Sequence, residues 1–105
     1  MKIGVLGGTF DPFHRGHLAI AEAARNRLGL AEVYFVPAAR TPLKESGKTL
    51  AAEHRVRMVR LAIAGYPYFK LSTVEIDRPG PSYTVDTIAE LRDKLGADNE
   101  LYFIV

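Results

Sequence analysis

The chain has 105 residues, of which 48% are hydrophobic and 25% charged, a balance typical of one folded domain and not of a disordered chain. Fourteen Lys and Arg against twelve Asp and Glu leave a formal net charge of +2, too small an excess to predict nucleic-acid binding. There is no cysteine, which excludes disulfides and thiolate metal sites, and no apolar run approaches the ~20 residues of a membrane span. We expect a cytoplasmic protein that binds neither nucleic acid nor membranes, and the sequence leaves its oligomeric state open.

The first 65 residues predict two strand-helix units. "KIGVLG" (residues 2–7) is apolar and ends in glycine, as buried strands do, and "EVYFVP" (32–37) predicts a second strand. A helix is predicted over 16–28 and another over 51–64, each followed by a glycine, with a long polar loop over 39–49. Their predicted inward residues are Leu18, Ala21, Ala24 and Leu28 in the first helix and Val56, Val59 and Ile63 in the second.

The remaining residues continue the alternation. A third strand is predicted over 70–76, a turn over 77–82, a helix over 84–95 and a fourth strand over 100–105; the predicted inward residues of this helix are Val85, Ile88, Leu91 and Leu95. The β-α-β-α-β-α-β order predicts an α/β fold, a Rossmann-like parallel sheet with helices on both faces.

Ligands of such sheets bind beyond the C-terminal ends of the strands. The fourth predicted strand runs to Val105, where a ligand-edge loop would be expected to follow. We therefore expect residues 1–105 to form one domain that is incomplete at its C-terminus, truncated after the fourth strand, and to be the first half or so of a longer protein.

The stretch "GGTFDPFHRGH" (7–17) lies at the first strand-to-helix turn. Gly7 and Gly8 lack a Cβ, so their backbone can adopt conformations closed to other residues and an anion can approach their N–H groups. The following helix directs its unpaired N–H groups toward the same space. His14 and His17, three residues apart, can share a face and donate to phosphate oxygens. This arrangement suits phosphoryl or nucleotidyl transfer, in which positioning and charge stabilisation dominate.

Other interpretations of this stretch are weaker. "GVLGGTF" matches neither the dinucleotide fingerprint nor the P-loop pattern. A zinc site at the two histidines would need further ligands, and His54 is the one histidine left, so no metal site is predicted. The structural alternative is that the glycines make a tight turn and the histidines cap a helix. The place of the pair after the first turn of an α/β sheet favours a nucleotide site, while Asp11 and Pro12 are predicted to brace the turn.

Together with "HRVRM" and "GPSYTVDT", the segment "GGTFDPFHRGHL" resembles bacterial nicotinate-nucleotide adenylyltransferases, within the HxGH nucleotidyltransferase superfamily, from Lys2 to the end of the chain. "HxGH" alone identifies the superfamily, whereas "GGTFDP" with "PSYTVDT" is more specific. The resemblance implies an enzyme of NAD biosynthesis that makes nicotinate adenine dinucleotide and pyrophosphate from ATP and nicotinate mononucleotide. The alternatives are pantetheine-phosphate adenylyltransferase, another HxGH nucleotidyltransferase, or a nucleotide-binding half-domain without turnover, since the 105 residues by themselves are expected to be inactive.

The resemblance also implies roles for the residues of the turn. The backbone around Gly8, Thr9 and Phe10 would line the site shared by the ATP α-phosphate and the mononucleotide phosphate. His14 and His17 would stabilise the charge that develops there. Because the two substrates repel each other, a Mg²⁺ ion bridging the ATP phosphates is expected, held mainly by phosphate oxygens and water.

Two further segments carry implied roles. In "TPLK", Lys44 can reach a phosphate as a mobile charge; relatives in the family have a Pro-Pro-His-Lys-like run there, so Leu43 in place of the histidine leaves that residue's role open. The "SYT" segment with Tyr83 and Thr84 approaches the nicotinate ring in the family, and the hydroxyl of Thr84 at a helix start would suit the carboxylate. Preference for nicotinate over nicotinamide stays undetermined by the sequence.

The basic residues of the second predicted helix have a simpler interpretation. His54, Arg55, Arg57 and Arg60 alternate with Val56 and Val59. This pattern is typical of an amphipathic helix, and it predicts that all four basic side chains lie on the solvated face.

Overall fold

A computed structural model describes residues 1–10, 13–38, 52–77 and 84–104. In these residues four parallel strands form one sheet in the order β3-β2-β1-β4. The strands are β1 (Lys2–Gly8), β2 (Glu32–Pro37), β3 (Phe69–Leu71) and β4 (Glu100–Phe103), and the helices are α1 (Arg15–Leu28), α2 (Ala52–Ile63), α3 (Val74–Asp77) and α4 (Thr84–Leu95). The predicted Rossmann-like α/β architecture is therefore confirmed.

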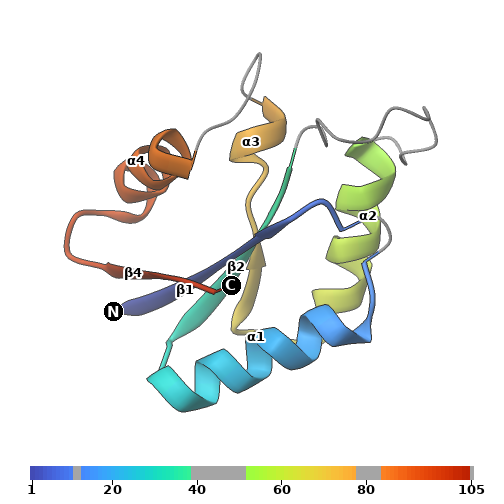
Figure 1. Ribbon diagram of the computed structural model, residues 1–105, viewed down its shortest axis with the longest axis horizontal. Coiled ribbons are helices and arrows are strands. Elements are labelled where there is room, and N and C mark those ends of the chain that lie inside the picture. Colours follow the sequence, from blue (N-terminus) through green and yellow to red (C-terminus); the bar gives the residue numbers. More distant parts are fainter. Residues whose placement is uncertain (11–12, 39–51, 78–83, 105) are drawn as a thin grey trace.

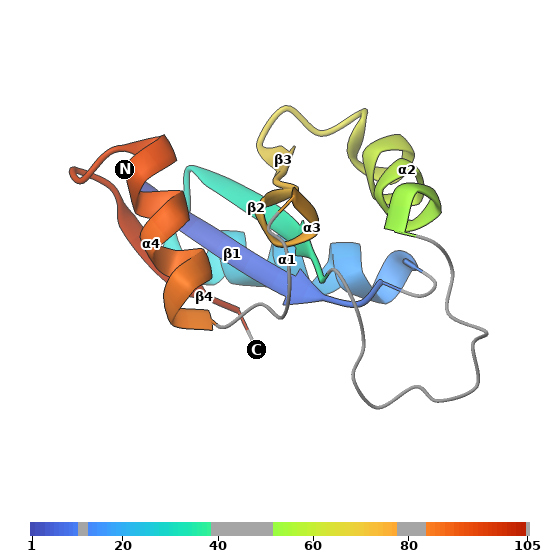
Figure 2. The same ribbon diagram turned by 90° about the horizontal axis from the view of Figure 1, so that it is seen from above.

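The helices cover both faces of the sheet, as predicted. Figure 1 shows α1 and α4 on opposite sides of the strands, and Figure 2 shows α4 on the β4 side of the molecule and α2 on the β3 side. One core joins α1 and α2 to the sheet through Ala21, Val59 and Ile63, packed with Val33 and Phe35. A second core lies on the other face, where Val74 and Leu91 pack against Val5 and Val36.

The central strand β1 is apolar because it lies inside the sheet and between the helix layers. Ile3, Val5 and Leu6 are all buried because β1 is paired on both edges, with β2 and with β4, and is covered on both faces. Gly4 is also fixed by packing: a Cβ at this position would lie 2.7 Å from Cδ1 of Leu30. The N-terminal strand therefore holds the sheet and both helix layers together.

The prediction of a strand over 70–76 is confirmed for Lys70 and Leu71 and is wrong from residue 72 onward. Strand β3 ends at Leu71, and Val74–Asp77 form the short helix α3. The Thr73 hydroxyl donates to Asp77 Oδ2 at 2.8 Å, and the Asp77 N–H donates to the Thr73 carbonyl at 2.9 Å. A local turn closed by these bonds replaces the strand that the β-branched residues suggested.

Two predicted inward residues are exposed. Val85, in the first turn of α4, is 71% exposed, and Leu28, in the last turn of α1, is 41% exposed. Helical spacing places both on the apolar side of their helices, but in the part of the chain that the structure describes Val85 stays largely uncovered and Leu28 lines a groove between α1 and the end of β4. The other predicted inward residues of α1, α2 and α4 are buried or half-buried.

The strand order locates the point where ligands bind in such sheets. From β1 the chain passes through α1 to β2 on one side and returns through α4 to β4 on the other. The order of the strands therefore reverses between β1 and β4. In open α/β sheets the crevice beyond the C-terminal ends of the strands at such a reversal is the usual binding site, and β1 leads there directly into "GGTFDPFHRGH".

Candidate active site

His14 and His17 cap the N-terminus of α1 with their side chains. The Gly16 N–H donates to Nδ1 of His14, and the His14 N–H donates to Nδ1 of His17, both at 3.0 Å. The two rings lie with their centroids 4.0 Å apart. This is a capping box in which histidines take the places usually held by Ser or Thr and by Glu or Gln. The structural alternative weighed above, that the histidines cap the helix, is therefore correct as a description of their Nδ1 atoms.

The same bonds determine what the other ring nitrogens can do. A neutral imidazole has one acceptor nitrogen and one N–H donor. Because Nδ1 of His14 and Nδ1 of His17 both accept backbone N–H groups, the proton of each neutral ring resides on Nε2. Capping and phosphate binding are thus compatible, since the cap orients two Nε2–H donors at the start of a helix, where anions are favoured.

Aromatic rings hold His17 in place. The Phe13 ring stacks on His17 at a centroid distance of 4.9 Å, and the Phe10 ring meets it edge-on at 5.0 Å. Burial, and to a lesser degree the neighbouring His14 ring, lower the pKa of His17 below its ordinary value of 6.5. At neutral pH His17 is therefore an uncharged hydrogen-bond donor with a fixed orientation.

Gly16 explains the glycine of the "HxGH" pattern. The His14 ring folds back over it, so that a Cβ added at Gly16 would lie 2.8 Å from Cε1 and 2.9 Å from Nδ1 of His14. Any other residue would displace the ring that caps the helix. No role was predicted for Gly16 from the sequence, although its position between the two histidines is a signal that could have indicated one.

The glycine turn differs from its prediction. Neither Gly7 nor Gly8 has a positive φ; Phe10 does, with φ of +52°. Gly8 lies close to a packed side chain instead: a Cβ there would lie 3.1 Å from Cε1 of the buried Phe10 ring, a tight contact that would require the ring to shift by a few tenths of an ångström. At Gly7 a Cβ would meet nothing closer than the Val36 carbonyl at 3.8 Å, and the residue is exposed, as a backbone open to a ligand would be. The unusual conformation belongs to the Thr9–Phe10 segment after β1.

Arg55 corrects the prediction that all four basic residues of α2 are solvated. His54, Arg57 and Arg60 are exposed, but Arg55 is 1% exposed. Its Nη1 donates to the carbonyl oxygens of Thr9 at 2.9 Å and Ala38 at 2.6 Å. Helical periodicity could not reveal this, because an arginine on a basic helix is usually exposed.

The "PSYTVDT" motif is structural in part. Its last residue, Thr87, is 2% exposed and donates from Oγ1 to Glu75 Oε2 at 2.8 Å, which joins α4 to α3. The backbone of Thr84 begins α4, on the same edge as the start of α1. The motif therefore fixes where α4 starts. Neither Glu75 nor Thr87 was singled out from the sequence.

Several predicted residues lie outside the described residues. Lys44 and Tyr83 do so, as do Asp11, Pro12 and the segment around Leu43, and for Thr84 the structure describes the backbone alone. The structure thus brings together Gly8, Thr9, Phe10, His14 and His17, and the proposed roles of Lys44, Tyr83 and Thr84 stay predictions.

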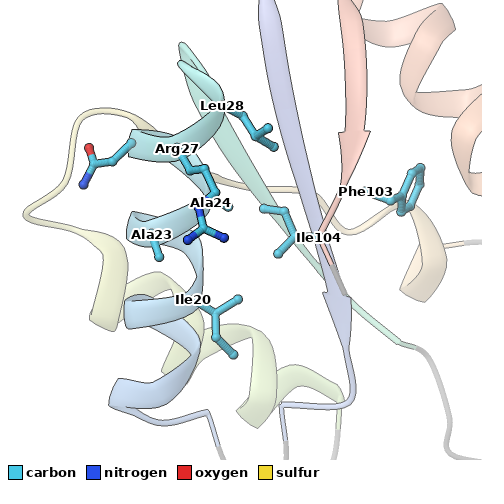
Figure 3. Close-up of a pocket in the computed structure, with 8 residues that line it drawn as sticks. Ile20, Ala23, Ala24, Arg27, Leu28, Phe103 and Ile104 are labelled. Carbon is cyan, nitrogen blue, oxygen red and sulfur yellow. The ribbon is translucent and has the colours of Figure 1, made fainter.

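A groove of about 700 Å³ lies elsewhere on the molecule. It is formed between α1 and the end of β4, and none of the predicted site residues lines it. In Figure 3 the Ile104 side chain points toward α1, whereas Phe103 points to the other side of β4.

Within the described ranges, no three His, Cys, Asp or Glu side chains are grouped as metal ligands would be. Nor does any described helix have the length and apolarity needed to cross a membrane.

The chain has a Rossmann-like α/β fold with a glycine-rich turn and a pair of histidines at its switch point. Residues 5–105 match the model of the cytidylyltransferase-like family. The chain belongs to that family, and its predicted place among the HxGH nucleotidyltransferases is confirmed.

Curated relatives within this family show which of its members the chain is similar to. The chain is 52% identical over 103 residues to a probable nicotinate-nucleotide adenylyltransferase of Moorella thermoacetica, covering 98% of this chain and 48% of that protein. It is 49% identical over 106 residues to a protein of the same name from Dehalococcoides mccartyi, covering 100% of this chain and 52% of the relative. The chain thus spans about half the length of these relatives.

A solved structure supports the fold. Nicotinic acid mononucleotide adenylyltransferase of Plasmodium falciparum, complexed with NaAD, superposes with a TM-score of 0.79 at 20% identity. The match covers 97% of this chain and 50% of that protein. The four-stranded sheet with its helices thus corresponds to about half of that protein.

Proposed function

We propose that this chain is the catalytic N-terminal part of a nicotinate-nucleotide adenylyltransferase, which transfers the adenylyl group of ATP to nicotinate mononucleotide. An oxygen of the mononucleotide phosphate forms a bond to the α-phosphorus of ATP, and the bond from that phosphorus to the bridging oxygen of the β-phosphate breaks. The products are nicotinate adenine dinucleotide and pyrophosphate. The observation that carries the proposal is the His14–His17 pair, held by backbone N–H groups so that both Nε2–H donors remain for phosphate oxygens.

The arrangement matches what the reaction needs. The mononucleotide phosphate is already a nucleophile, so the protein has to align two anions and offset their repulsion. The start of α1 supplies backbone N–H groups, and the two imidazoles supply donors in fixed orientations. Magnesium is proposed to arrive with ATP as part of the substrate, where it neutralises phosphate charge.

The outer parts of the substrates are assigned to residues at the same edge. We place the nicotinate carboxylate at the start of α4, where helix N–H groups and the Thr84 hydroxyl suit an anion, with Tyr83 beside the ring. Lys44 is proposed to contact a phosphate. The names of the curated relatives support these substrates.

The test uses a protein of the relatives' length that carries these 105 residues, called the extended chain below. Pyrophosphate release is measured with ATP, Mg²⁺ and either nicotinate mononucleotide or its amide, and the dinucleotide is identified by mass spectrometry. We expect kcat/KM for the nicotinate substrate to be at least about tenfold higher, because the amide NH₂ would face N–H donors and leave them unpaired. Equal constants would remove the carboxylate assignment of Thr84, and no pyrophosphate release with either substrate would contradict the proposed function.

The role of the histidines is tested by His17→Ala in the extended chain. Because the bond from Nε2 to phosphate should strengthen as charge develops, we expect kcat/KM to fall by about 10² or more. His54→Ala, which removes an exposed imidazole on α2, is the control and should leave the rate unchanged. Near-parental turnover of folded His17→Ala would exclude this role.

A further inference from the structure

Arg55 is a buried cation that donates hydrogen bonds to two backbone carbonyls. It lies on α2 with 1% of its surface exposed, although the flanking residues Glu53, His54 and Arg57 are exposed. A guanidinium is always charged, and burying it is costly unless its donors are satisfied. An apolar side chain of similar volume could fill the space without that cost. The hydrogen bonds to the carbonyls of Thr9 and Ala38 satisfy guanidinium donors that this burial would otherwise leave unpaired.

Those hydrogen bonds join two loops at the ligand edge of the sheet. Nη1 of Arg55 donates to the carbonyls of Thr9, which follows β1, and Ala38, which follows β2. The Ala38 N–H in turn donates to the Gly8 carbonyl at 2.9 Å. The ends of two neighbouring strands and α2 are thus connected at one point, next to the turn that leads to His14.

The bond to Thr9 has a consequence for Phe10. In a planar trans peptide the carbonyl and the following N–H point in opposite directions. By fixing the carbonyl of Thr9, Arg55 therefore fixes the direction of the Phe10 N–H, which points away from α2. Phe10 has φ of +52°, a conformation uncommon for residues other than glycine, and its ring contacts His17.

We propose that Arg55 is a positioning residue of the adenylyl-transfer site, which sets the orientation of the Thr9–Phe10 peptide and, through the Phe10 ring, of His17. The inference rests on the proposed function for its kinetic consequence, because the backbone around Thr9 and Phe10 is where the reacting phosphates are assigned. Arg55 itself touches neither substrate in this proposal. It acts through the two carbonyls that it holds.

The kinetic test compares Arg55→Met, Arg55→Lys and the exposed Arg57→Met control in the extended chain. Misalignment of the phosphates should lower kcat about tenfold or more for Arg55→Met, with both KM values within about threefold of the parent. Arg55→Lys keeps the charge but not the guanidinium geometry. Its kcat should therefore lie between the kcat of the parent and that of Arg55→Met. Arg57→Met should match the parent within about twofold.

A second measurement keeps the inference testable if Arg55→Met fails to fold. In ¹H–¹⁵N spectra with ¹⁵N-labelled phenylalanine, the Phe10 amide should shift in Arg55→Lys and stay in place in Arg57→Met. Folded Arg55 variants with parental kcat would overturn the proposal, and so would variants that lose stability while kcat per folded molecule is unchanged. If the parent itself transfers no adenylyl group, the proposed function fails. The orientation of the Thr9–Phe10 peptide by Arg55 is then tested by the Phe10 amide signal alone, and an unshifted signal in Arg55→Lys overturns it.

Discussion

Gly16 determines whether the His14 ring can cap α1. We expect Gly16→Ala to force the ring away from the Gly16 N–H, because the new Cβ would lie 2.8 Å from Cε1 of His14. Loss of a helix cap typically costs about 1 kcal/mol, and the displaced Nε2 should also lower kcat/KM. Urea unfolding and pyrophosphate release in the extended chain measure the two effects.

Gly65→Ala is the matched control for that prediction. A Cβ at Gly65 would meet nothing within 4 Å, and the residue has no positive φ. The substitution should therefore leave stability and activity unchanged or raise stability slightly. If Gly16→Ala behaved in the same way, the cap would have no importance for the site.

The lowered pKa of His17 predicts a pH dependence of stability. The unfolded chain takes up a proton at this residue as the pH falls through 6.5, whereas the folded chain does so only at lower pH. The free energy of unfolding that His17 contributes should therefore be fully present above about pH 6.5 and decrease as the pH falls below that value.

His17→Gln isolates this effect, because Gln is an ordinary residue at the third position of a capping box but does not titrate. Urea unfolding of the extended chain at about pH 7.5 and about pH 5.5 should show a larger loss of stability for the parent than for His17→Gln. Equal losses would mean that His17 titrates alike in both states.

At the scale of elements, the Thr87–Glu75 bond determines how α4 is attached. Thr87→Val keeps the shape of the side chain but leaves the Glu75 carboxylate without this donor, so we expect a loss of about 1–3 kcal/mol. Because α4 begins three residues earlier, at Thr84, KM for nicotinate mononucleotide should rise as well. Thr87→Ser, which retains the hydroxyl, should behave nearly as the parent; a parental Thr87→Val would show that α3 and α4 are held by their apolar contacts.

At the scale of the whole molecule, the groove between α1 and β4 leaves apolar side chains uncovered. Ile20 is 46% and Leu28 41% exposed, and β4 has no partner on its second edge among the described residues. We expect residues 1–105, purified by themselves, to self-associate through this surface and to show negligible dinucleotide synthesis.

Light scattering during size-exclusion chromatography measures that association. Ile20→Glu should reduce it, whereas Leu61→Glu, at a residue that is 71% exposed on α2 and does not line the groove, should not. A monomer that turns over at the ~1–10³ s⁻¹ typical of enzymes would contradict the expectation that residues 1–105 form an incomplete domain.

The sequence by itself determined the three long helices, the four strands apart from the extent of the third, and the place of the candidate site at the first strand-to-helix turn. Each of these rests on local information: apolar periodicity, glycines after helices, and two histidines spaced by a glycine at the first strand-to-helix turn. Those signals act over a few residues, so they can be recognised before the chain is folded.

The tertiary structure decided which side chains those elements bury. Arg55 resembles its exposed neighbours in sequence, and Val85 resembles the buried residues of α4, yet Arg55 is 1% and Val85 71% exposed. The positive φ also belongs to Phe10 and not to the glycines before it. The physical reason is that burial and backbone strain depend on what packs against a residue. The Thr9 carbonyl that Arg55 binds lies 46 residues away in the chain, and no local pattern records such a partner.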